Sequence, residues 1–208
     1  MTVPGVTLSD GRAASRPLLF VRHGATQPNL DGLRCGGDLD LPLTETGRAQ
    51  MAAAARALRE GGWRIERIVT SDLERTRESA QIAARLFGGV PIDVDAAWRE
   101  RRLGQWNLRP LAENAAQLAA GLPPPGGEAA PAFAARIESA LRTFLRRHPP
   151  ATLTLLVGSK GVARVLGELL GAPASSPVDN GALLCFDLAR LRQAPRAIEH
   201  ALIQSTAS

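Results

Sequence analysis

The stretch Leu18-Leu19-Phe20-Val21-Arg22-His23-Gly24 decides the fold class of this 208-residue chain. An apolar run that stops on a cation, an imidazole and a glycine is typical of a strand buried on both faces of a parallel sheet. In open α/β sheets ligands lie just beyond the carboxyl ends of such strands, which is the position of His23. An imidazole can act as a nucleophile, and a guanidinium can hold a phosphate with two parallel hydrogen bonds. On its own, however, an Arg-His pair at a strand end is more often packed or solvated than catalytic.

The composition limits the class of protein. With 45% hydrophobic residues the chain can bury a substantial core. We therefore expect a flexible leader over residues 1–16 and one domain over residues 17–208. The net charge of +5 comes from scattered arginines, with five Phe, three Trp and no Tyr, so we expect a small anionic ligand and no nucleic acid.

The sequence also predicts a location for the protein. It has no run of about 18 apolar residues and no signal-peptide pattern, so we expect no membrane association. Cys35 and Cys185 lie far apart without metal-ligand spacing, which fits a reduced compartment. These features predict a cytoplasmic protein.

Strand and helix patterns alternate along the chain, which predicts an α/β fold: a doubly wound, mostly parallel sheet with helices on both faces. Thr44 and Asp72 are expected to cap the first two helices. We expect helices over residues 45–59, 72–86, 131–147 and 162–170, and extended segments over residues 18–22, 65–70, 91–98, 152–157, 182–188 and 197–204. Residues 25–43 form a long loop, and residues 107–130 form an irregular insertion, with a short helix near 110–120, that is a candidate lid.

Polar motifs follow the predicted strands in a recurring order. They are Arg22-His23-Gly24 with Thr26 and Asn29, Asp40 before Pro42-Leu43-Thr44 and Gly47, Ser71-Asp72-Leu73 with Arg75 and Ser79-Ala80, and Glu100 with Gly104 and Trp106. In order and spacing this set resembles the histidine phosphatase superfamily, in its phosphoglycerate-mutase-like branch, over residues 18–190. The resemblance implies a doubly wound α/β domain and phosphoryl transfer through a phosphohistidine on His23, without a metal or another cofactor.

The same resemblance implies roles for four further residues. Arg22 and Arg75 would grip the phosphate, Asn29 would contact it from the long loop, and Glu100 would be the proton donor. The chemistry agrees, because a transferring phosphoryl group needs positive charge and hydrogen-bond donors around its oxygens. Seen alone, Arg75 could be a surface residue and Asn29 an ordinary turn residue. We assign Asp40 to capping or loop structure rather than to catalysis.

The fourth strand end departs from the family. Members usually carry a second histidine there, whereas aligning this chain on Gly161 and Arg164 places Ser159 at that position, followed by Lys160. Losing one preorganised donor can cost on the order of 100- to 1,000-fold in rate. In one interpretation Lys160, the only lysine among 25 basic residues, replaces the lost cation and the Ser159 hydroxyl donates to the phosphate. In the other, Ser159 is a helix N-cap and Lys160 points into solvent.

The sequence therefore favours a metal-independent phosphatase that acts on a small phosphorylated metabolite, with His23 as the nucleophile and Glu100 as the acid and base. A phosphoglycerate mutase-like phosphotransferase is the nearest alternative. A non-catalytic pseudoenzyme that binds a phosphorylated ligand or a partner is the alternative from another class.

Overall fold

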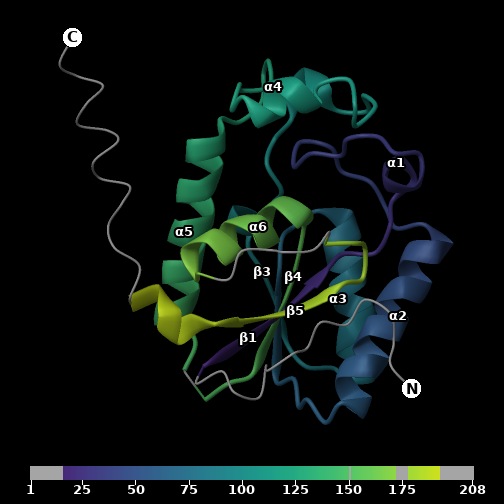
Figure 1. Cartoon of the computed structure of the whole chain (residues 1–208). Coiled ribbons are helices and arrows are strands. Elements are labelled where there is room, and N and C mark those ends of the chain that lie inside the picture. The colour runs from purple at the N-terminus through teal and green to yellow at the C-terminus, as the bar shows by residue number, and fades with distance from the viewer. Residues whose placement is uncertain (1–15, 150, 172–177, 193–208) are drawn as a thin grey trace.

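The computed structural model describes residues 16–149, 151–171 and 178–192, which form a five-stranded sheet between two layers of helices (Figure 1). The strand order is β3-β2-β4-β1-β5. Four strands are parallel, and β5 runs antiparallel to β1 at one edge. The strands are β1 (Pro17–Arg22), β2 (Arg67–Thr70), β3 (Ile92–Val94), β4 (Thr154–Gly158) and β5 (Leu183–Asp187). The expected doubly wound, mostly parallel sheet is confirmed.

Two helices cover each face of the sheet. Helices α2 (Glu45–Glu60) and α3 (Glu74–Leu86) pack on one face, and α5 (Ala130–Arg147) and α6 (Lys160–Leu169) pack on the other. Successive side chains of a strand point to opposite faces, so β1 contributes to both cores. Leu19 and Val21 pack with α2 and α3, whereas Leu18 and Phe20 pack with α5 and α6. This two-sided burial explains why β1 is a continuous apolar run.

The first two long helices begin in different ways. Thr44 caps α2 as expected, because its hydroxyl accepts a hydrogen bond from the Gly47 N–H at 3.0 Å. The prediction that Asp72 caps α3 is wrong: its carboxylate pairs with both Nε and Nη2 of Arg99 at 2.6 Å. The free N–H of Glu74 at the start of α3 instead donates to Asp40 at 2.7 Å. Asp40 therefore has the capping role that we assigned to it.

Several shorter segments differ from the expected ones. Of the extended segment predicted over residues 91–98, only β3 is a strand. After it, Asp95 caps a 3-10 helix, η1 (Ala96–Trp98), because its carboxylate accepts a hydrogen bond from the Ala97 N–H. The loop over residues 25–43 contains a short helix, α1 (Gln27–Leu30). Within 107–130 the helix is shorter than expected, α4 (Ala115–Ala119). Two more 3-10 helices are η2 (Gly104–Trp106) and η3 (Leu188–Arg192).

Two predicted segments lie outside the described residues: the strand over 197–204, and the leader except for residue 16. No helix in the described ranges is both long and apolar enough to cross a membrane.

The topology creates a crevice between β1 and β4. These neighbouring parallel strands end at the same edge of the sheet, with Arg22 opposite Gly158. The chain leaves β1 toward α2 on one face and leaves β4 toward α6 on the other, which is the switch point where α/β folds bind ligands. His23 and Ser159 directly follow these two strands, and the His23 N–H donates to the Gly158 carbonyl at 2.9 Å.

Candidate active site

His23 is held as a buried, neutral imidazole with a defined tautomer. Its Nδ1 lies 2.8 Å from the Gly24 carbonyl oxygen. Because a carbonyl can only accept, Nδ1 carries the proton and Nε2 keeps its lone pair. Burial of the ring, and then the positive charges of Arg75 and Arg22, lower the pKa of His23 well below its ordinary value of 6.5. A neutral ring with a free Nε2 is the form that can attack phosphorus.

Gly24 has a packing reason to be glycine. A Cβ at this position would lie 2.1 Å from the Gly47 carbonyl oxygen in the first turn of α2. The Gly24 N–H also donates to the Ser79 hydroxyl at 3.2 Å, and that hydroxyl donates to the Arg75 carbonyl at 2.7 Å. Gly24, Gly47 and Ser79 therefore fix the loop after β1 against α2 and α3.

The two predicted phosphate-binding arginines occupy different environments. Arg22 lines the cavity described below, and its Nη1 donates to the Val178 carbonyl at 2.7 Å. Burial lowers the pKa of its guanidinium, although Glu100 and Asp179 oppose this effect. Arg75 is completely buried, does not line the cavity, and donates to the carbonyl oxygens of Leu39 at 2.7 Å and Gly36 at 3.0 Å. Arg75 thus acts on His23 through its charge while it also fixes the loop.

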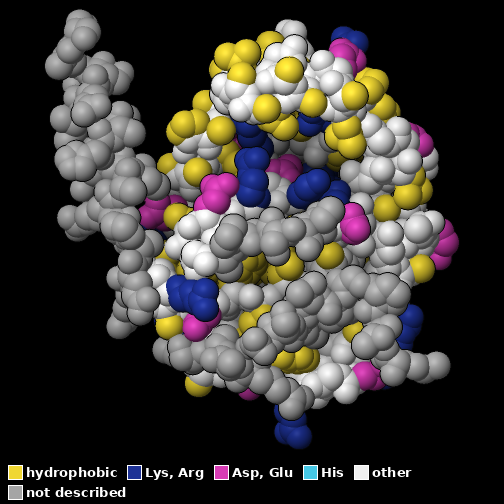
Figure 2. All heavy atoms as spheres, in the orientation of Figure 1, with side chains coloured by type: hydrophobic (Ala, Val, Ile, Leu, Met, Phe, Trp, Pro, Cys, Tyr) yellow, Lys and Arg dark blue, Asp and Glu magenta, His cyan; other side chains and the backbone are white. Residues whose placement is uncertain are grey.

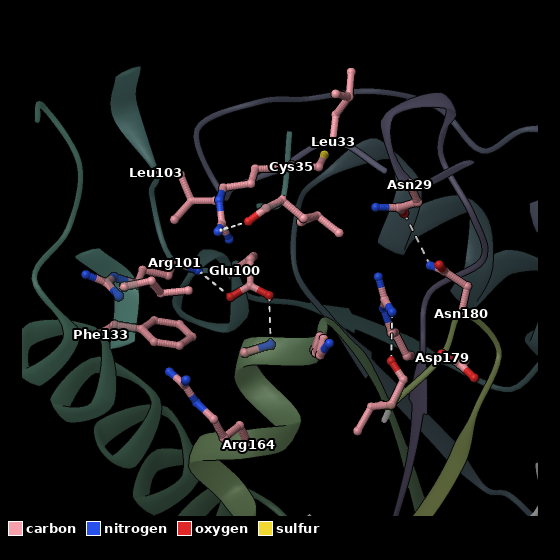
Figure 3. Close-up of a pocket in the computed structure, with 17 residues that line it drawn as sticks. Asn29, Leu33, Cys35, Glu100, Arg101, Leu103, Phe133, Arg164, Asp179 and Asn180 are labelled. Carbon is pink, nitrogen blue, oxygen red and sulfur yellow. Dashed lines mark hydrogen bonds between the residues drawn. The ribbon is translucent and has the colours of Figure 1, made fainter. Parts of the chain in front are cut away.

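Asn29 lies on the cavity wall and is hydrogen-bonded to Asn180, a residue that the sequence patterns did not predict in the site. Its Oδ1 accepts from the Thr26 N–H at 3.2 Å and from Nδ2 of Asn180 at 3.3 Å. Figure 3 shows the amide nitrogen of Asn29 directed into the cavity. Asn180 also donates to the His23 carbonyl at 2.9 Å. The position of Asn180 just before β5 could have indicated its place in the site. β5 is antiparallel to β1, so it begins at the edge of the sheet where the parallel strands end.

Glu100 faces the same cavity, and its carboxylate is held by backbone groups. One oxygen accepts from the Arg101 N–H at 2.7 Å and the other from the Gly161 N–H, in the first turn of α6, at 2.8 Å. A Cβ at Gly161 would lie 2.1 Å from Glu100 Oε1, and one at Gly37 would lie 1.9 Å from the Glu100 carbonyl oxygen. The carboxylate therefore depends on two glycines for its position.

Ser159 and Lys160 form the junction between β4 and α6. Ser159 occupies the N-cap position, but its side chain makes no capping hydrogen bond, and its Oγ is buried without a partner among the described residues. Lys160 is exposed and lines the cavity. The anion at the start of α6 is the Glu100 carboxylate, which interacts favourably with the positive end of the helix dipole.

Arg22, Asn29, Glu100 and Lys160 line a cavity of about 580 Å³, which is large enough for a small metabolite. Figure 2 shows Lys and Arg side chains bordering a hollow beneath the segment that contains α4. His23, Arg75 and Ser159 are buried and are not among the lining residues. The charged lining residues are Arg22, Arg34, Arg101, Lys160, Arg164, Glu100 and Asp179. Positive charge dominates, which suits an anionic ligand. Within the described ranges no three His, Cys, Asp or Glu side chains are grouped as a metal site requires.

A doubly wound α/β domain with a buried histidine after β1, arginines beside it and a carboxylate across the cavity has the architecture of a histidine phosphatase. A family model described as "Histidine phosphatase superfamily (branch 1)" matches residues 18–198, and the chain belongs to this family.

Relatives of this chain include named enzymes. Over 187 residues, 81% of this chain and 79% of the relative, it is 32% identical to glucosyl-3-phosphoglycerate phosphatase of Mycolicibacterium vanbaalenii. Over 167 residues, 74% of this chain and 75% of the relative, it is 36% identical to a probable phosphoglycerate mutase GpmB of Cronobacter sakazakii. A match to fructose-2,6-bisphosphatase TIGAR B of Danio rerio, 32% identical over 142 residues, covers 62% of this chain but only 53% of that protein.

A solved structure agrees with the fold. Mycobacterial glucosyl-3-phosphoglycerate phosphatase in complex with VO3 superposes with a TM-score of 0.70 at 29% identity, covering 82% of this chain and 90% of the other.

Proposed function

We propose that this protein hydrolyses a small phosphomonoester through a phosphohistidine on His23. The single observation that carries the proposal is the buried imidazole with its proton fixed on Nδ1, because this leaves Nε2 free to attack phosphorus. Arg22 and the amide of Asn29 supply charge and a donor at the same cavity. The related phosphatases named above support hydrolysis of small phosphorylated metabolites.

The reaction divides into two transfers. Nε2 of His23 attacks phosphorus, the bond to the alcohol oxygen breaks, and Glu100 in its protonated form gives a proton to that oxygen. The Glu100 carboxylate then takes a proton from water as the water oxygen attacks the phosphohistidine. Inorganic phosphate leaves, and both His23 and Glu100 return to their starting forms. Arg22 and Arg75 offset the negative charge throughout. No step uses a metal or another cofactor.

Ser159 and Lys160 are proposed as the phosphate donors that replace the family's second histidine. Two observations support this role: the Oγ of Ser159 is buried without a hydrogen-bond partner in the described part of the chain, and the exposed Lys160 lies on the cavity wall. Loss of phosphate affinity in both Ser159→Ala and Lys160→Ala is the expected result. A Lys160→Ala variant with full turnover and full phosphate affinity would instead support the solvent-exposed alternative.

The segment over residues 107–130 is proposed as the lid of this site, within one domain over residues 17–208. Leu111 and Leu118 of this segment line the cavity, and Arg34 from the long loop donates to the Leu111 carbonyl at 2.6 Å and to the Asn114 side chain. A cytoplasmic location remains part of the proposal.

Trapping the intermediate tests the proposed function. Brief incubation with a 32P-labelled phosphomonoester, followed by quenching in alkali, should leave label on the wild-type protein, because phosphohistidine survives base and is lost in acid. His23→Ala should carry no label and show no turnover, whereas His148→Asn, a second histidine outside the cavity lining, should behave as wild type. Turnover should also persist in the presence of a chelator.

The alternatives give different results. A mutase would convert 3-phosphoglycerate into its 2-phospho isomer with little release of inorganic phosphate. A pseudoenzyme would bind phosphorylated ligands while wild type and His23→Ala are equally inert toward aryl phosphates.

A further inference from the structure

Arg136 on α5 is an arginine whose five N–H groups all have acceptors. Its Nε donates to Glu128 Oε1 at 3.0 Å, and its Nη2 donates to Glu128 Oε2 at 2.7 Å. Its Nη1 donates to the carbonyl oxygens of Ala97 and Arg99, both at 2.9 Å, and Nη2 also donates to the Glu100 carbonyl at 3.3 Å. Because a guanidinium holds its donors in a fixed plane, this one side chain ties α5 to the backbone that ends at Glu100.

The backbone around Glu100 belongs to neither a helix nor a strand. Residues 99–103 connect η1 to η2, so the hydrogen bonds of regular secondary structure do not hold them. Backbone carbonyls that lie away from water need donors, and here the Arg136 side chain supplies them. On another side the same backbone is closely packed, since a Cβ at Gly37 would lie 1.9 Å from the Glu100 carbonyl oxygen. The position of this segment therefore depends on contacts from elsewhere in the chain.

Glu128 keeps the Arg136 guanidinium in place. The Glu128 side chain is buried, and its Oε2 also accepts from the Arg102 N–H at 3.3 Å. The neighbouring Arg101 is buried without a carboxylate partner in the described structure, and its Nε donates to the backbone carbonyl of Glu128 at 2.7 Å. The Arg136–Glu128 pair is therefore bonded to the backbone on both sides of Glu100.

The backbone of Glu100 and its carboxylate are held from different helices. Arg136 holds the backbone from α5, whereas the Gly161 N–H of α6, at 2.8 Å, and the Arg101 N–H, at 2.7 Å, hold the carboxylate (Figure 3). A group that gives and takes a proton must lie within hydrogen-bond distance of the reacting oxygen. A displacement of about 1 Å can cost on the order of 100-fold in rate. The proposed proton transfers thus depend on both attachments.

We infer that Arg136 is a positioning residue for the proton transfers of Glu100. Arg136 is not among the residues that line the cavity, so it acts through Glu100 and not on the substrate. Its planar set of five donors is what the role requires, because the three donors of a lysine share one nitrogen and cannot reach the same acceptors. This inference rests on the proposed function and adds to it a residue outside the cavity.

Arg136→Lys tests the inference, because lysine keeps a positive charge beside Glu128 but loses the planar set of donors. The leaving oxygen of glycerol 3-phosphate needs a proton, so kcat for this substrate should fall about 10- to 100-fold. For p-nitrophenyl phosphate, which has a good leaving group, kcat should fall less than about 3-fold. Arg142→Lys, the same exchange at an exposed position of α5, should keep both wild-type values.

A double-mutant cycle separates positioning from a general structural role. In a Glu100→Gln background, Arg136→Lys should cause no further loss on glycerol 3-phosphate, because no proton donor remains to be displaced. Equal losses on the two substrates, no loss on either, or a full additional loss in Glu100→Gln would overturn the inference. If Arg136→Lys does not fold, the double variant Glu128→Gln/Arg136→Gln removes both charges of the pair and should show the same substrate-dependent loss.

A readout without turnover separates this inference from the proposed function. If wild type and His23→Ala are equally inert, the proposed function fails. The amide resonance of Gly161 in 1H–15N spectra then reports the position of Glu100, because this N–H donates to the Glu100 carboxylate. A shift of that resonance in Arg136→Lys, in the direction that Glu100→Gln produces, supports the inference. A resonance that stays at its wild-type position, as it should in Arg142→Lys, overturns it.

Discussion

The carboxylate of Glu100 accepts a hydrogen bond of 2.8 Å from the backbone N–H of Gly161, in the first turn of α6. Helix α6 follows Ser159 and Lys160, where this chain differs from the family pattern. Its backbone thus fixes the proposed proton donor, whichever residue occupies position 159. Gly161 is a positioning residue, because a Cβ there would overlap the carboxylate.

Gly161→Ala should lower kcat about 10- to 100-fold, because a displacement of about 1 Å in a reacting group can have that effect. The fold should persist, since alanine has the higher helix propensity. Steady-state kinetics together with circular dichroism measure both quantities. Glu168→Ala, an exposed position on the same helix, should keep wild-type kcat on an aryl phosphate. Full activity in Gly161→Ala would show that the position of Glu100 does not depend on this glycine.

Glu100→Gln should slow turnover by a factor that depends on the leaving group of the substrate. An alkyl phosphate needs a proton on its leaving oxygen, so its kcat should fall by about 100-fold or more. For p-nitrophenyl phosphate, whose phenolate is a good leaving group, the loss should stay below about 10-fold. Comparing the two substrates in wild type, Glu100→Gln and Glu60→Gln measures this difference, because Glu60 is exposed at the end of α2. Equal losses on both substrates would argue against a proton donor.

His23 should be neutral at pH 6.5, the ordinary pKa of histidine, with its proton on Nδ1. Burial, Arg75 and Arg22 all oppose protonation, so the pKa of His23 lies well below 6.5 and the imidazolium forms only in more acidic solution. Two-bond 1H–15N spectra, assigned by comparison with His23→Ala, report both the tautomer and the titration. Arg22→Met should raise the pKa of His23. A titration midpoint near 6.5 in wild type would contradict the electrostatic description of the site.

Glu128 should stabilise the fold in a pH-dependent way. Burial acts to raise the pKa of its carboxyl group, but the hydrogen bond and charge of Arg136 outweigh burial and hold the pKa below its ordinary value of 4.5. The stabilisation is therefore complete above that ordinary value and is lost as the pH falls through the lower pKa of the folded state. Glu128→Gln should reduce the free energy of unfolding by roughly 3 kcal/mol at pH 7, and the difference should shrink once the pH falls below the lowered pKa of the folded state.

Urea unfolding of wild type and Glu128→Gln at several pH values measures this effect. Glu60→Gln, at an exposed position, should change the free energy of unfolding by less than about 0.5 kcal/mol. A difference between wild type and Glu128→Gln that does not vary with pH would show that the ion pair is not its source.

Local sequence signals were sufficient for the elements with strong periodicity. β1, β4, α2 and α5 were predicted because each buries a regular set of apolar residues. The start of α3 was mispredicted because its cap, Asp40, comes from a loop 34 residues earlier and not from the neighbouring Asp72. A propensity rule considers only the nearest side chains.

The sequence by itself determined the α/β class, the strand that delivers His23, and the family. Those features depend on short-range apolar patterns and on motif spacing, which are present in the order of residues. Only the tertiary structure decided that Asn180 lies beside His23, that Gly161 holds Glu100, and that Arg101 is buried without a carboxylate partner in the described structure. Each of these relationships joins segments that are distant along the chain, and their distances, burial and charge balance exist only once the sheet brings its strand ends to one edge.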